Sequence, residues 1–256
     1  MKYLKTFELF ESQLYEKDKF TPPKELTKKE LEHRWKKKRT AIKILKNNIS
    51  KLKRQVTSDL NSKDEKTQLI ATVIKIIEMT GERVGNENSS LNGHHGITNF
   101  QNKHIKISGN NITLKYMGKS GVDHNVIIRN STIANILKKL KRKNKDNIFI
   151  TSDGSKIHPT QVNNYLSKFD ITSKDLRGFK ANKLMREKLS KLKKTKDDKE
   201  IKKNFNEILR QVAEIIGHGA ATLRKHYLLP EIEENYYKYG SVGYVKSIWK
   251  WIWKNY

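Results

Sequence analysis

Residues 104–128, HIKISGNNITLKYMGKSGVDHNVII, are the part of this sequence that most restricts the possible fold. Apolar and polar residues alternate there in three short runs, which is the pattern of half-buried strands. The runs are separated by GNN at residues 109–111 and by GKSG at residues 118–121, and these residue types are typical of tight turns. We therefore predict a small, antiparallel, three-stranded β-meander.

Helical patterns lie on both sides of the predicted meander. Before it, residues 67–80 (TQLIATVIKIIEMT) are apolar almost all round, which indicates a buried helix, and we expect this helix to end at Gly81. After the meander, a short strand is predicted at residues 147–150 (NIFI). Helices are expected at residues 131–142, 159–169, 174–192 and 204–217. The sequence therefore predicts an α+β fold that is mainly helical and contains one small sheet.

The charge balance narrows the class of partner. The chain has 54 Lys and Arg residues against 27 Asp and Glu residues, which gives a formal net charge of +27. A chain this cationic is expected to bind nucleic acid or an anionic membrane, because neutralising phosphates releases condensed counterions. An AT-rich genome would supply many lysines, but such a codon bias does not remove carboxylates. We therefore favour nucleic acid as the partner.

Other classes of chemistry find no support in the sequence. The chain has no cysteine, which excludes disulfides, thiolate metal sites and cysteine nucleophiles. No pair of carboxylates and no histidine cluster has the spacing of metal ligands, so we expect neither metal nor cofactor. The first twenty residues mix charge into every turn and resemble neither a signal peptide nor a membrane span. The expected location is therefore the cytoplasm.

The GKS sequence at residues 118–120 does not indicate a phosphate-binding loop of the Walker type. Such a loop needs a glycine five residues before GK, and that position is Thr113. The context is also strand–turn–strand and not strand–loop–helix. Lys119 is instead expected at the tip of a hairpin, either solvated or reaching into a groove.

Four further residues are candidates for a site, although each has an ordinary structural explanation. Arg83 in GERVGNE and Arg177 in SKDLRGFKAN fit solvent-exposed arginines, and His218 in IGHG fits a helix-end cap. Tyr227, nine residues after that histidine, fits a packed aromatic residue. However, only 10 of the 54 basic residues are Arg, and bidentate phosphate recognition requires Arg specifically.

Taken in order, these residues resemble the active site of type IB DNA topoisomerases of the poxvirus and bacterial kind. The matching stretches are ERVGNE, YMGKSG, KDLRGFKAN and IGHGAATLRKHY, which lie within residues 66–230. Tyrosine recombinases share this set of residues, including the interval of nine between histidine and tyrosine. ERVGNE, the GITNF sequence after it and the meander are more similar to the topoisomerase branch. The site that the resemblance implies comprises Arg83, Lys119, Lys174, Arg177, His218 and Tyr227.

The resemblance also implies a role for each of these side chains. Tyr227 would be the nucleophile that becomes linked to the 3′-phosphate of DNA. Lys119, assisted by Arg83, would be the general acid, and Lys174 matches an auxiliary lysine of the family. The residues that would hold the scissile phosphate are Arg83, Arg177 and His218.

The chemistry agrees with these residue types. A phosphotyrosine ester keeps the energy of the phosphodiester bond, so that religation needs no ATP. A phenol has a pKa near 10 and needs a cationic environment to act as a nucleophile. Arginine and histidine donors stabilise the charge of the transition state, as Mg²⁺ does in other phosphoryl-transfer enzymes. A lysine among cations has a lowered pKa and can protonate the leaving 5′-oxygen.

The resemblance implies a catalytic domain and a double-stranded DNA partner, whereas the segments before and after that domain are interpreted from their own residues. Residues 1–65 are expected to be a basic, largely helical arm or a reduced N-terminal domain, where the family has a small β-rich domain that closes over DNA. Residues 66–235 would be the catalytic domain, acting as a monomer. For the Trp- and Lys-rich segment 236–256, a docked helix, a DNA-binding tail and a membrane-surface helix all stay open.

Two other functions are compatible with the sequence. A tyrosine site-specific recombinase would use the same chemistry in a synapse of several protomers, and it would usually have a larger N-terminal helical domain. A DNA-binding protein without activity would not need the full set of catalytic side chains. We therefore favour a topoisomerase that relaxes supercoiled DNA.

Overall fold

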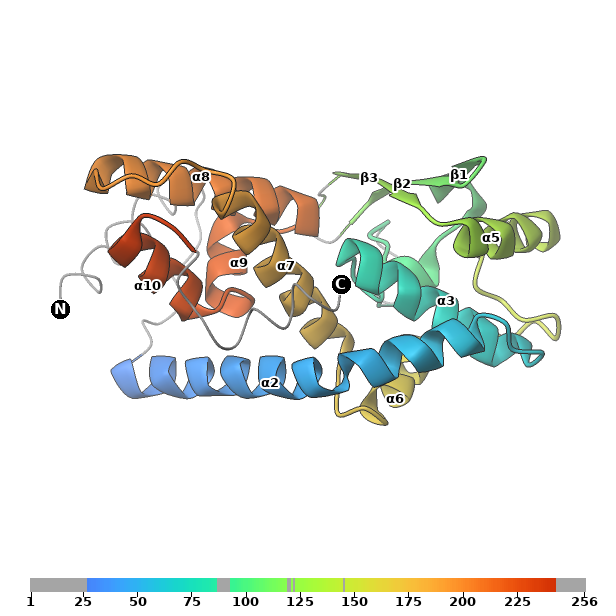
Figure 1. Ribbon diagram of the computed structural model, residues 1–256. Coiled ribbons are helices and arrows are strands. Elements are labelled where there is room, and N and C mark those ends of the chain that lie inside the picture. The colour runs from blue at the N-terminus through green and yellow to red at the C-terminus, as the bar shows by residue number, and fades with distance from the viewer. Residues whose placement is uncertain (1–26, 87–92, 119–120, 122, 145, 243–256) are drawn as a thin grey trace. The chain divides into compact units, whose positions relative to one another are not determined.

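The computed structural model describes residues 27–86, 93–118, 121, 123–144 and 146–242 (Figure 1). The chain divides into two compact units, Met1–Lys37 and Lys38–Tyr256. Of the first unit, the structure describes residues 27–37, which include the beginning of helix α2 (Lys28–Asp59). The second unit contains the hydrophobic core and every candidate site residue that the structure describes.

Helix α2 contributes one apolar face to this core. Ile42, Leu45, Ile49, Leu52 and Val56 recur every three or four residues and are all at most 9% exposed. Lysines occupy much of the remaining surface of the helix, which explains why the sequence here is dominated by charge. The Lys-rich region therefore forms a single long helix, of which the part after residue 41 is packed on one side.

Helix α3 (Glu65–Thr80) is the buried helix that the apolar run predicts. At its start, the Asp64 side chain accepts a hydrogen bond from the Thr67 amide. At its end, Gly81 adopts the left-handed conformation with φ 77° and donates its amide to the Ile77 carbonyl. Both the helix and its end at Gly81 are confirmed.

The predicted meander is confirmed as a three-stranded antiparallel sheet in the order β1-β2-β3. The strands are β1 (Ile105–Ser108), β2 (Asn111–Met117) and β3 (Asp123–Arg129). Ile112, Leu114 and Tyr116 alternate along β2 with more exposed residues and face the core. Helix α3 packs against β3, and α5 (Ser131–Lys143) packs against β2 (Figure 1).

Five helices follow α5 and complete the mainly helical fold that the sequence predicts. Helix α7 packs against α3, α6, α8 and α10, and α8 also packs against α9 and α10 (Figure 1). Their bounds are α6 (Pro159–Ser167), α7 (Ser173–Leu189), α8 (Asp198–Ile216), α9 (Ala220–His226) and α10 (Pro230–Tyr239). Two short 3₁₀ turns, η1 (Ile97–Asn99) and η2 (Asn102–His104), precede the sheet.

The short strand predicted at residues 147–150 is wrong. Only isolated bridges occur there, between Gln101 and Asn147 and between Ile150 and Lys156. Ile148 and Phe149 are nevertheless fully buried. A short apolar run signals burial, but it does not by itself distinguish a strand from a buried irregular segment.

The buried side chains form one cluster that extends from Ile42 to Val242. The predicted boundary after residue 65 falls at the first residue of α3, and both α2 and α3 contribute to this cluster. Residues 243–256, on which the alternatives for the Trp-rich tail depend, lie outside the described part of the chain. Among the helices that the structure describes, none is long and apolar enough to span a membrane.

Candidate active site

Four of the six predicted site residues lie together where several helices end. Arg83 follows the end of α3, and His218 follows the end of α8. Arg177 lies on α7, and Tyr227 is the residue that ends α9. The convergence of these elements brings together side chains that are up to 144 positions apart in the sequence.

Arg177 is the centre of the cluster. It is only 5% exposed, so the alternative that it faces solvent is excluded. Its Nε donates to the Gly81 carbonyl at 2.6 Å, and its Nη2 donates to the Ile216 carbonyl at 3.1 Å. These carbonyls lie at the C-terminal ends of α3 and α8, where the helix dipole favours a cation. Burial lowers the pKa of Arg177, but a guanidinium stays charged under ordinary conditions.

His218 lies between two guanidinium groups. Its Nδ1 is 2.9 Å from Nη2 of Arg83, and its Nε2 is 3.0 Å from Nη2 of Arg177. Burial, and then the charges of the two arginines, lower the pKa of His218 to about 3. The imidazole is therefore neutral near pH 7 in this arrangement. A neutral imidazole has one acceptor nitrogen, so it can accept from only one of the two arginines.

Tyr227 presents its hydroxyl to the same arginine. Nη1 of Arg177 donates to the Tyr227 hydroxyl at 3.1 Å. The Tyr227 ring centroid lies 4.8 Å from that of His218 and 5.4 Å from the guanidinium carbon of Arg177. The phenol oxygen is therefore held beside two side chains that can bind a phosphate.

Asn182 holds the backbone of the tyrosine, and sequence reasoning did not identify it. Its amide nitrogen donates to the Tyr227 carbonyl at 2.8 Å, and its oxygen accepts from the Leu229 amide at 2.8 Å. It is fully buried on α7, five residues after Arg177. The sequence shows only that an asparagine lies on the same predicted helix as Arg177. It does not show that this asparagine is buried.

The structure does not test the other two predicted residues equally. Lys119 lies outside the described residues. Lys174 is exposed in the first turn of α7, one turn before Arg177, and none of the hydrogen bonds found among the described residues joins it to the cluster. Arg224 pairs with Glu233, which gives this arginine a structural role between α9 and α10.

The cluster has more donors than acceptors. Two guanidinium groups and a phenol hydroxyl surround one neutral imidazole, and guanidinium groups have no acceptor at all. An anion with several oxygens, such as a phosphate, matches this set of donors. Such an anion would lie directly beside the Tyr227 hydroxyl. The arrangement can therefore bind a phosphodiester and place a nucleophile next to its phosphorus.

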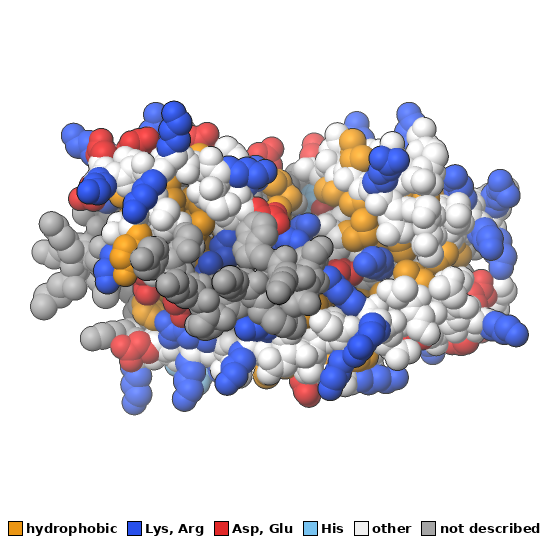
Figure 2. Space-filling view, viewed as in Figure 1, with side chains coloured by type: hydrophobic (Ala, Val, Ile, Leu, Met, Phe, Trp, Pro, Cys, Tyr) orange, Lys and Arg blue, Asp and Glu red, His pale blue; other side chains and the backbone are white. Residues whose placement is uncertain are grey.

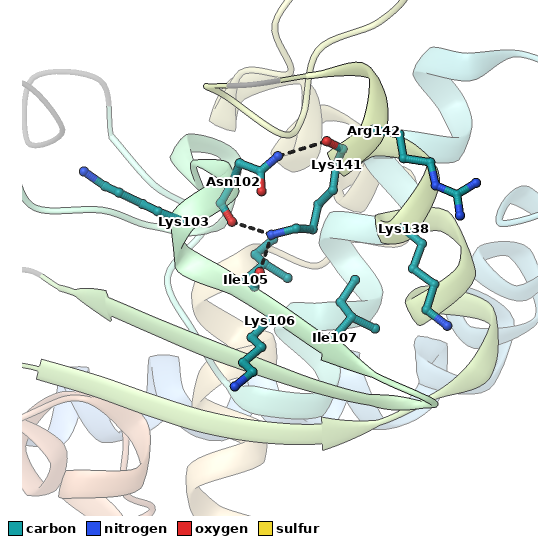
Figure 3. A pocket seen from close by; sticks show the side chains of 8 residues that line it. All are labelled: Asn102, Lys103, Ile105, Lys106, Ile107, Lys138, Lys141 and Arg142. Carbon is teal, nitrogen blue, oxygen red and sulfur yellow. Dashed lines mark hydrogen bonds between the residues drawn. The ribbon is translucent and has the colours of Figure 1, made fainter.

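A second cationic feature lies between η2, β1 and α5. A pocket of about 510 Å³ is lined there by basic side chains, and none of its lining residues is acidic (Figure 3). Lys141 donates to the carbonyls of Asn102 and Ile105, so that its ammonium group belongs to the wall of the pocket. The basic residues that line the pocket are Lys103, Lys106, Lys138, Lys141 and Arg142.

No cluster of metal ligands was found in the described part of the chain. Its histidines, aspartates and glutamates nowhere form a group of three or more that could hold a metal ion.

Comparison with known proteins gives a family match. Residues 27–239 match the model of the catalytic core of eukaryotic DNA topoisomerase I. The matched region is wider than the expected stretch of residues 66–230, because it also takes in helix α2.

Viral relatives show the same similarity. DNA topoisomerase 1B of Acanthamoeba polyphaga mimivirus is 30% identical over 197 residues, which cover 71% of this chain and 59% of the relative. DNA topoisomerase I of monkeypox virus is 27% identical over 147 residues, which cover 54% of this chain and 44% of the relative. The chain thus spans about half the length of these relatives. Among solved structures, a post-cleavage complex of the XerH site-specific recombinase with its difH substrate is 18% identical, with a TM-score of 0.45, covering 85% of this chain and 53% of that one.

Proposed function

Since this chain belongs to the type IB DNA topoisomerase family, we propose that it relaxes supercoiled DNA by cutting and resealing one strand. The reaction would need neither ATP nor a metal ion, and the protein would act as a monomer on double-stranded DNA. The cytoplasmic location expected from the sequence is part of this proposal. The observation that supports the chemistry best is that Arg177 donates to the Tyr227 hydroxyl and also lies within hydrogen-bond distance of His218.

Cleavage would begin with a phosphodiester bound among the guanidinium groups. The Tyr227 oxygen attacks phosphorus, a bond forms between them, and the bond from phosphorus to the 5′-oxygen breaks. The phenol proton leaves to solvent, and the departing 5′-oxygen takes a proton from Lys119, the proposed general acid. Arg83, Arg177 and His218 donate to the non-bridging oxygens, whose negative charge increases in the transition state.

Religation would reverse these steps. The free 5′-hydroxyl attacks the phosphotyrosine, its proton returns to the lysine, and the phenol leaves as it regains a proton. One phosphate ester is exchanged for another in each direction, so that no external source of energy is needed. Rotation of the free end between the two steps would change the linking number. Lys174 would assist as an auxiliary cation one turn before Arg177.

The cationic pocket would add contacts to the DNA backbone. Lys106 and Lys138 line it from β1 and α5, and no carboxylate among the lining residues competes for their charge (Figure 3). Phosphate contacts of this kind supply most of the sequence-independent affinity of DNA-binding proteins. We therefore include this pocket in the proposed DNA-binding surface.

The proposal is tested by relaxation of supercoiled plasmid in EDTA without ATP. We expect the wild type to produce a ladder of relaxed topoisomers and Tyr227→Phe to produce none, a loss of at least about 1,000-fold. Tyr239→Phe is the matched control, because it removes the hydroxyl of an exposed tyrosine at the end of α10 and should leave the ladder unchanged.

Relaxation by the Tyr227→Phe variant would contradict the assigned nucleophile. A wild type that neither relaxes plasmid nor forms a covalent adduct with DNA would contradict the proposed activity. A wild type that forms the adduct through Tyr227 but relaxes no plasmid would favour a site-specific recombinase.

A further inference from the structure

Three buried polar side chains form a network next to the catalytic cluster. Glu82, Tyr116 and His124 are 0%, 5% and 6% exposed. The Tyr116 hydroxyl donates to one oxygen of Glu82, and Nδ1 of His124 lies 2.8 Å from the other. The rings of Tyr116 and His124 stack with centroids 4.6 Å apart. We refer to these three residues as the buried triad.

The buried triad touches the segments that carry the proposed catalytic residues. Glu82 directly precedes Arg83 in the chain. Tyr116 and His124 face each other across β2 and β3, at the end of the hairpin whose loop contains Lys119. Through the triad, Glu82, the residue before Arg83, is therefore joined to both β2 and β3. These are the strands on either side of the loop that contains the proposed general acid.

His124 also contacts the end of α8. A Cβ atom added to Gly217 would overlap Cε1 of His124, so the imidazole packs directly on the glycine backbone. Gly217 is the residue before His218. The close approach fixes the distance between the hairpin and the start of the segment that carries the catalytic histidine.

Packing alone does not explain why these three buried side chains are polar. A buried carboxylate loses its hydration, and apolar side chains of similar volume commonly give equal or greater stability. Burial and the adjacent Glu82 carboxylate raise the pKa of Tyr116, which keeps its hydroxyl protonated and able to donate. Hydrogen bonds of fixed direction, unlike apolar contacts, define the relative orientation of the segments they join.

We propose that Glu82, Tyr116 and His124 are positioning residues that hold the β2–β3 hairpin in register with Arg83 and His218. This inference rests on the proposed function, in which the loop of the hairpin supplies the general acid. Loss of a hydrogen bond in the triad would displace the hairpin relative to the bound phosphate. The step expected to become slower is protonation of the leaving 5′-oxygen.

A DNA substrate with sulfur in place of the bridging 5′-oxygen isolates this step. A thiol has a pKa near 8.5, far below that of an alcohol, so a thiolate leaves without protonation. A variant that is defective in placing the general acid should therefore be slow on the oxygen substrate and close to normal on the sulfur substrate. A variant with disturbed phosphate binding should be slow on both.

The variants are Tyr116→Phe and Glu82→Gln, which keep shape and volume while weakening the network. Single-turnover formation of the covalent protein–DNA adduct is measured on both substrates. We expect both variants to be at least about tenfold slower than wild type on the oxygen substrate, and within about threefold of wild type on the sulfur substrate. Tyr165→Phe is the matched control, because Tyr165 donates to Asp59 between α6 and α2, in a part of the core that holds no site residue. This control should be normal on both substrates.

Equal slowing on both substrates, or normal rates on both, would overturn the inference. Thermal melting of each variant shows whether the fold is intact, and rescue by sulfur is itself incompatible with a merely unfolded protein. The proposed function has a separate criterion, since its failure leaves the wild type without an adduct on either substrate.

Discussion

At the residue scale, the cluster around Arg177 is arranged for an anion rather than for its own stability. Two arginines approach opposite nitrogens of His218, although a neutral imidazole can accept from only one of them. The low pKa of His218 is the cost of this arrangement, and it follows from burial and from the two positive charges. A phosphate beside the imidazole would oppose both arginine charges and raise that pKa.

The low pKa of His218 predicts a loss of stability in acid. An unfolded chain binds a proton on this histidine below about pH 6.5, whereas the folded protein binds it only near pH 3. The unfolded state is therefore favoured increasingly as pH falls from 6.5 towards 3, and this contribution is absent above pH 6.5.

This dependence is measured by thermal melting of wild type and His218→Gln between pH 7.5 and 4. We expect the melting temperature of the wild type to fall further than that of the variant. His104, whose pKa burial lowers to about 4, is present in both proteins and cancels in the comparison. Parallel curves for the two proteins would show that His218 titrates normally in the fold.

At the element scale, the ends of α3 and α8 build the site. Both helices end in a left-handed glycine, Gly81 with φ 77° and Gly217 with φ 69°. These turns redirect the chain, so that Arg83 follows two residues after Gly81 and His218 follows directly after Gly217. They also leave carbonyls at the ends of both helices for Arg177. The β2–β3 hairpin then packs on the second turn through His124.

Gly217→Ala should therefore destabilise the fold more than an alanine at another left-handed glycine. The left-handed conformation costs a non-glycine residue about 1–2 kcal/mol, and overlap with His124 adds about 1–3 kcal/mol. Gly109→Ala is the matched control, because Gly109 has φ 58° and no heavy atom lies within 4 Å of the position that an alanine Cβ would take there. Urea denaturation measures both free energies of unfolding. Equal losses would mean that the ring of His124 moves aside without cost.

At the scale of the whole molecule, basic side chains are not confined to the cluster around Arg177. Figure 2 shows Lys and Arg side chains over α8 as well as over α5 and the sheet. With 54 basic against 27 acidic residues, the acidic side chains of the chain can neutralise at most half of the basic ones. The affinity for DNA should therefore depend strongly on the salt concentration.

The contribution of the pocket between β1 and α5 to this salt dependence can be measured separately. DNA affinity is measured against salt concentration for wild type, for a double Lys106→Ala, Lys138→Ala variant and for the corresponding double arginine variant. Each lost phosphate contact lowers the slope of log affinity against log salt by about 0.9, so the double alanine variant should lose about 1.8. The arginine variant keeps both charges and should keep the slope. An unchanged slope in the alanine variant would place the pocket outside the DNA-binding surface.

Local patterns were sufficient to predict most of the elements. The buried helix that ends at Gly81 and the three-stranded meander follow from periodicity and turn residues, which depend on neighbours a few positions apart. The error at residues 147–150 has the same origin, since burial without a periodic pattern does not specify a strand. The sequence also identified Arg83, Arg177, His218 and Tyr227 as candidates, because their residue types and their order along the chain were sufficient for that.

The sequence by itself therefore determined the class of fold, the charge and the candidate residues of the site. Only the tertiary structure decided that Arg177 is buried against two helix ends, that Asn182 holds the tyrosine and that Glu82 joins the hairpin to the arginine segment. The bonds involved join residues 96, 45 and 34 positions apart. Such contacts depend on how helices pack in three dimensions, and no local pattern of polarity records that packing.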